Sequence, residues 1–85
     1  MLPAPPEVPS TAHGFVVLGV DPGLANCGLA AIQWRNGKAK ALEWGTVVTK
    51  PSEPTPVRVA TICRELRAWI ERHRPIALEI GRAHV

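Results

Sequence analysis

Residues 15–23 read FVVLGVDPG, an apolar run followed by an acidic residue and a turn. The apolar part, residues 15–20, predicts a buried strand. Asp21 then lies at the carboxyl end of that strand, which is the edge where α/β proteins bind ligands. The desolvation of a carboxylate there is unfavourable unless hydrogen bonds from the glycine-containing turn or a divalent cation compensate for it. The stretch therefore predicts an α/β domain with a candidate metal ligand at Asp21.

The residues after this turn predict an antiparallel meander of three strands. Residues 27–34 resume as a second strand, and the Asn36-Gly37 pair that follows favours a type I′ hairpin. A third strand, at about residues 40–49, is then expected to run antiparallel to the second. Residues 50–54 contain two prolines and predict a loop.

A helix is predicted from residue 55 to residue 74. Thr55 is a suitable N-cap, and Pro56 fits the first helical position because its missing N–H is not needed there. Apolar residues then recur at spacings of three and four, which predicts one packed stripe made of Val59, Ile62, Cys63, Leu66 and Ile70. Basic residues in the last turn and Pro75 after it mark the end of the helix.

Residues 76–79 predict a fourth strand, and a crossover through the helix would lay it parallel to the first. Glu79, at its carboxyl end, would then face Asp21. Two neighbouring carboxylates at one sheet edge form half of a site for a divalent metal. The topology therefore predicts Asp21 and Glu79 as a pair.

Length and composition limit the chain to one small domain. Its 85 residues carry a formal charge of +3, which permits a polyanionic partner without requiring one. Cys27 and Cys63 lack metal-type spacing, so we interpret them as reduced packing residues of an intracellular protein. No apolar stretch approaches the roughly 20 residues that span a bilayer. We expect a cytoplasmic location and no membrane partner.

The amino-terminal residues 1–14 differ in composition from the rest of the chain. Four prolines fall within residues 1–10, and neither a basic start nor a long apolar stretch of a secretory signal is present. We interpret residues 1–14 as a disordered extension or as an artefact of an upstream start codon.

Three segments together resemble a known family. They are VLGVDPGLANCGLA at residues 17–30, EWGTVVT at residues 43–49 and RPIALE at residues 74–79. Their order and spacing resemble the amino-terminal half of the RuvC family, the Holliday-junction resolvases, which are homodimeric nucleases of the ribonuclease H-like fold. The resemblance implies an α/β, ribonuclease H-like domain over residues 15–79. That fold is incomplete here, with a three-strand meander, a crossover helix and a fourth strand parallel to the first.

The resemblance also implies a function. The family cuts four-way DNA junctions in recombination and repair, with Mg²⁺ ions held by four acidic residues in a two-metal site. Asp21 and Glu79 match two of these acids, so both are implied to be metal-binding catalytic residues. The other two belong to a later helix that this chain does not reach. The implied partners are junction DNA and a second copy of the complete protein. The resemblance is also compatible with contacts to other recombination proteins. We expect little or no cleavage by these residues alone.

Two other functions compete with this interpretation. Actin-like and sugar-kinase-like ATPases also begin with an apolar strand and Asp-x-Gly, but they carry small hydroxyl residues after that glycine, where this chain has Leu24-Ala25. The third candidate is a non-catalytic module that binds DNA or dimerises. Base stacking by Trp34, Trp44 and Trp69 would suit it, although we interpret these side chains as packing residues.

The last six residues, Ile80 to Val85, depart from the family pattern. They match the translation of a short-read sequencing adapter, ATC GGA AGA GCA CAC GTC. The same frame would supply the final two bases of the Glu79 codon and leave only its first G native. We therefore predict a non-native tail over residues 80–85.

Overall fold

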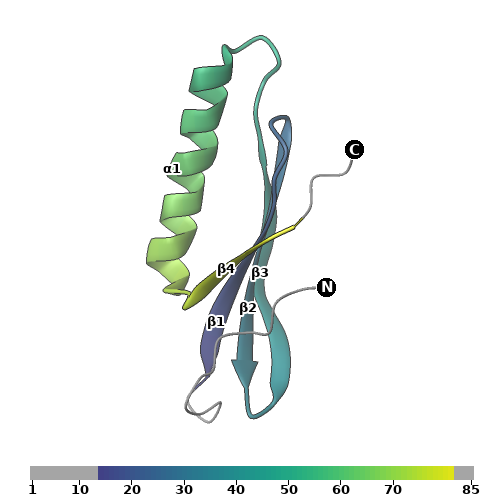
Figure 1. The fold of residues 1–85 in the computed structure, drawn as a ribbon, viewed down its shortest axis with the longest axis vertical. Helices are drawn as coiled ribbons and strands as arrows, with labels where there is room; N and C mark the ends of the chain where they lie inside the picture. Colours follow the sequence, from purple (N-terminus) through teal and green to yellow (C-terminus); the bar gives the residue numbers. More distant parts are fainter. Residues whose placement is uncertain (1–13, 82–85) are drawn as a thin grey trace.

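Residues 14–81 fold into one sheet with a single helix across one of its faces (Figure 1). The structure is a computed structural model that describes residues 14–81. Its elements in chain order are β1 (Phe15–Asp21), β2 (Asn26–Arg35), β3 (Lys38–Val48), α1 (Thr55–His73) and β4 (Ala77–Ile80). Nearly all of the predicted extension, residues 1–13, and most of the predicted tail, residues 82–85, lie outside the described residues.

The strand order in the sheet is β3-β2-β1-β4. The β1–β2 and β2–β3 pairs are antiparallel, whereas β4 pairs with β1 in parallel. This confirms the predicted ribonuclease H-like arrangement of a meander, a crossover helix and a parallel fourth strand. It also places the carboxyl ends of β1 and β4 side by side.

The hairpin between β2 and β3 follows from its turn residues. Asn36 and Gly37 both adopt positive φ, 52° and 73°, as a type I′ turn requires. Because this turn takes only two residues, β3 begins at Lys38, two residues before the predicted start, and it ends at Val48. A bulge interrupts the ladder where Ala31 pairs with Glu43 but Ile32 pairs with Ala41.

The predicted start of the helix was wrong by one residue. Pro54, with extended backbone angles, is the N-cap, and there is no side-chain cap from Thr55. The Pro54 carbonyl accepts hydrogen bonds from the amides of Val57 and Arg58, so the first turn is closed by backbone groups alone. At the other end, Arg74 adopts the left-handed conformation and donates its amide to the Ile70 carbonyl.

The core lies between α1 and the sheet. Its buried residues are Leu18, Cys27, Leu29, Ala31, Val47 and Trp69. Trp69 is the only buried residue of α1, and its indole packs over Gly45, where a Cβ would make an ordinary contact at 3.5 Å. Cys27 is thus the packing residue that the sequence predicted.

The predicted apolar stripe of α1 is confirmed only in part. Ile62, Leu66 and Ile70 pack against the core. Cys63 is exposed, because it lies about 100° around the helix axis from Ile62. Val59 is 45% exposed and lines an open apolar depression beside the β1–β2 turn.

A charged cluster attaches the end of α1 to β3. The Arg72 guanidinium donates to both carboxylate oxygens of Glu43, at 3.0 and 3.1 Å, and His73 contacts the same carboxylate. Hydrogen bonding by His73 and then by Arg72 holds the pKa of the Glu43 carboxyl below its ordinary value. The Arg72 guanidinium also lies over the Trp69 ring, 5.4 Å from its centre.

Within residues 14–81, no helix is both long and apolar enough to cross a membrane.

Candidate functional site

The candidate site lies on the sheet face that α1 does not cover. Since side chains alternate along a strand, this face carries the residues between the core positions. Strand pairing places them in two adjacent rows across the sheet. The first row is Thr46, Gly28, Asp21 and Gly81, and the second is Trp44, Ala30, Gly19 and Glu79.

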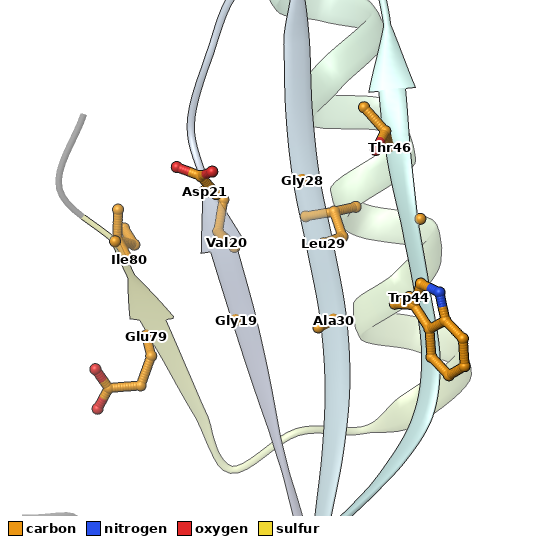
Figure 2. A pocket seen from close by; sticks show the side chains of 12 residues that line it. Gly19, Val20, Asp21, Gly28, Leu29, Ala30, Trp44, Thr46, Glu79 and Ile80 are labelled. Atoms are coloured by element: carbon orange, nitrogen blue, oxygen red, sulfur yellow. The ribbon is translucent and has the colours of Figure 1, made fainter. Parts of the chain in front are cut away.

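Small residues make this face hollow. Gly28 in the first row and Ala30 and Gly19 in the second are small, and they line an open depression of about 520 Å³ between β3 and β4. Asp21 and Glu79 line the same depression from β1 and β4 (Figure 2). Both acids thus line one depression, whereas their predicted role as a pair of metal ligands stays a prediction.

Asp21 stands between two glycines. Gly28 pairs with it on β2, where an added Cβ would lie 3.4 Å from the Asp21 Cβ. Gly81 follows β4 on the other side, and its amide donates to the Val20 carbonyl at 2.7 Å. No neighbouring side chain in these two positions shields the exposed Asp21 carboxylate, so its oxygens are open to a ligand.

Glu79 is offset from Asp21 by one row. It pairs with Gly19, two residues before Asp21, so the two acids are diagonal neighbours and do not face each other directly. Their side chains extend in different directions in Figure 2. Strand geometry puts their Cα atoms about 8 Å apart. Among residues 14–81, neither acid forms a salt bridge, and no cluster of three or more metal-binding side chains occurs.

Trp44 stands at the opposite end of the second row and is 74% exposed. The prediction that it is a packing residue was therefore wrong within the described residues. The reason is the alternation of β3, which turns Trp44 away from α1 while its neighbour Gly45 receives Trp69. The prediction of a packing role holds for Trp69 and not for Trp44.

The sequence analysis missed a polar network at the end of β3. Thr49 is 4% exposed, and its hydroxyl donates to the Leu24 carbonyl in the β1–β2 turn. The same hydroxyl accepts a hydrogen bond from Nε of Arg58 at 2.8 Å. A threonine placed directly after a strand was the available signal, but its partner lies 25 residues earlier in the chain.

Comparison with known proteins assigns this fold to a family. The family model described as crossover junction endodeoxyribonuclease RuvC matches residues 17–85. The chain belongs to the RuvC family. This match includes both candidate acids, and it supports the nuclease relationship over the one with actin-like ATPases.

Individual RuvC proteins show how much of the family domain is present. RuvC of Syntrophomonas wolfei is 39% identical over 64 residues, which are 75% of this chain and 37% of that protein. RuvC of Nocardioides is 40% identical over 67 residues, or 78% of this chain and 38% of that protein. The chain thus spans less than half the length of these RuvC relatives.

Solved RuvC structures show the same fold. Thermus thermophilus RuvC in complex with a Holliday junction substrate superposes with a TM-score of 0.75 at 33% identity, covering 80% of this chain and 42% of that one. A second structure of the same RuvC gives a TM-score of 0.72 at 32% identity, with 82% and 44% covered.

Proposed function

We propose that this chain is the amino-terminal part of a metal-dependent endonuclease that cuts four-way DNA junctions. The observation that carries the proposal is the placement of Asp21 and Glu79 on one open sheet face within a RuvC-family fold. The junction bound to the Thermus thermophilus relative supports the choice of substrate.

The two acids fit a divalent cation. Both offer hard oxygen ligands, both lack a basic partner among residues 14–81, and Gly28 beside Asp21 leaves room for water and phosphate. Mg²⁺ suits such a site, because it keeps several waters and takes one or two carboxylates plus substrate phosphate. A bound cation would polarise the phosphodiester and lower the pKa of the attacking water. The role of Asp21 and Glu79 would be to hold it beside the scissile bond.

The remaining parts of the proposal concern assembly and location. Two symmetric cuts in a four-way junction need two active sites, so we propose a homodimer of the protein at the length of its relatives. A DNA substrate of this kind suits a cytoplasmic protein. The acids of the later helix would complete the metal site, and we expect the 85 residues to cut poorly without them.

The test uses a chimera in which residues 14–79 replace the matching segment of Thermus thermophilus RuvC. We expect magnesium-dependent cutting of a synthetic four-way junction by the chimera. Asp21→Asn should lower its rate by about 100-fold or more, since losing several kcal/mol of metal stabilisation corresponds to at least that factor.

Glu71→Gln is the matched control, because it makes the same carboxylate-to-amide change on the exposed surface of α1. It should cut at the parental rate. Equal cutting by the parent chimera and its Asp21→Asn form would refute the proposal. Junction binding without cutting by the parent chimera would favour a DNA-binding module instead.

A further inference from the structure

Thr49 is the only buried polar residue among residues 14–81. Burying a hydroxyl is unfavourable unless it is hydrogen-bonded, and here its bonding capacity is used in two directions. The hydroxyl donates to the Leu24 carbonyl and accepts from Arg58, while the Thr49 amide donates to the Ala25 carbonyl at 3.1 Å. One residue therefore joins the end of β3, the β1–β2 turn and the first turns of α1.

The turn held by Thr49 is the one that follows Asp21. Residues 22–25 connect β1 to β2. This loop is longer than the two-residue hairpin turns, whose own backbone conformation fixes the pairing of the strands. Gly23 is needed inside it, because a Cβ there would collide with the Asn26 carbonyl. The carbonyls of Leu24 and Ala25 find their partners in Thr49.

Strand ends open more readily than strand centres, and Asp21 is the last residue of β1. Its pairing with Gly28 is the last pair before the turn. If the turn moved freely, this pair would open, and the direction of the carboxylate relative to Glu79 would vary. A hydroxyl that holds the turn against β3 limits this opening.

We infer that Thr49 is a positioning residue for Asp21: its buried hydroxyl holds the β1–β2 turn in the conformation that presents the carboxylate to a divalent cation. This inference rests on the proposed function. Arg58 extends the device to α1, since its Nε hydrogen bond orients the hydroxyl toward Leu24. Thr49 touches neither cation nor substrate and acts through the turn.

The test removes the hydroxyl and keeps the shape. Thr49→Val is nearly isosteric and lacks the donor, whereas Thr49→Ser retains it. In the 85-residue chain, we expect amide exchange at residue 49 and at Asp21 to rise about tenfold in Thr49→Val relative to the Ala31 amide, as the loss of one buried hydrogen bond implies. Thr49→Ser should remain within about twofold of the parent.

The second readout is cation binding. Mn²⁺ added to the same chain should broaden the NMR signals around Asp21, and the midpoint concentration should rise at least about threefold in Thr49→Val, in keeping with a modest loss of preorganisation. Thr49→Ser should restore the parental midpoint. Thr61→Val, which removes a hydroxyl bonded only within α1, is the control and should change neither readout.

The outcomes separate this inference from the proposed function. If Asp21→Asn abolishes the Mn²⁺ effect but Thr49→Val titrates like the parent, the positioning role is refuted and the metal site stands. If Mn²⁺ broadens no signal near Asp21 in the parent and the Asp21→Asn chimera cuts normally, the proposed function fails first. Should Thr49→Val not fold, Thr49→Ala leaves space for a water, and a raised or unchanged midpoint in that variant decides the question in the same way.

Discussion

Trp69 is the one fully buried side chain that α1 contributes to the core, and this makes Trp69→Ala the sharpest test of the fold. Trp69 is 6% exposed and is the only buried residue of the helix. It fills the space over Gly45, carries the Arg72 guanidinium on its face and lies 5.7 Å from the His73 ring. Truncating a buried tryptophan to alanine destabilises a protein by about 3–5 kcal/mol.

This expected loss of stability can be compared with the total free energy of unfolding. A chain of 85 residues has a free energy of unfolding of about 4–13 kcal/mol. The substitution would therefore remove a large share of the stability, and an undocked helix of this length is only marginally stable in water. Since α1 leads directly into β4, the strand that carries Glu79 should be lost with it.

Urea unfolding followed by far-ultraviolet circular dichroism measures the effect. Trp44→Ala is the matched control, because it deletes the same side chain from the open face, where it is 74% exposed. It should change the unfolding free energy by no more than about 0.5 kcal/mol. A loss below about 1 kcal/mol in Trp69→Ala, or equal losses in the two variants, would refute the assignment of the core.

Three further predictions follow from other parts of the chain. The lowered pKa of Glu43 means that its bonds to Arg72 and His73 stabilise the fold fully above the ordinary carboxyl pKa of 4.5 and that this contribution is lost as the pH falls through the lowered value. Unfolding measured across acidic pH should therefore show a shallower dependence in Glu43→Gln, and an unchanged slope would contradict the cluster. Gly23→Ala should force the β1–β2 turn to shift, with altered NMR signals around Asp21 but not around the β2–β3 hairpin; unaltered signals at Asp21 would argue against the turn geometry. An independent genomic copy should diverge from this chain after position 79, whereas a copy that encodes the same residues 80–85 would rule out an adapter-derived tail.

The fold was predictable because its signals are local. The adjacent residues Asn36 and Gly37 are enough to predict the hairpin. Pro75 marks the end of the helix and directly follows Arg74, which adopts the left-handed conformation. The parallel pairing of β4 then follows from general rules of chain connection. Each of these predictions used residues near the element that it concerned.

The predictions that were wrong or missing depend on contacts between residues far apart in the sequence. Periodicity alone predicted Val59 and Cys63 as core residues, but α1 buries Trp69 over Gly45, a contact between residues 24 positions apart. Likewise, the hydroxyl of Thr49 is buried because of a carbonyl in a turn that precedes it by two strands. Such contacts are selected by three-dimensional complementarity, which no local pattern of residue types records.

The candidate site combines both kinds of information, and this explains why its parts were predictable to different degrees. Asp21 and Glu79 can be predicted from the local sequence, because each lies at the carboxyl end of a short apolar run. The topology then places them on adjacent strands. Their mutual orientation is a different matter, since it depends on a one-row offset in register and on how firmly the strand ends are held. Gly28 beside Asp21 leaves the carboxylate open but does nothing to fix its direction. Groups outside the site must therefore provide the rigidity, and in the described part of the chain the buried hydroxyl behind the turn is the one placed to do so.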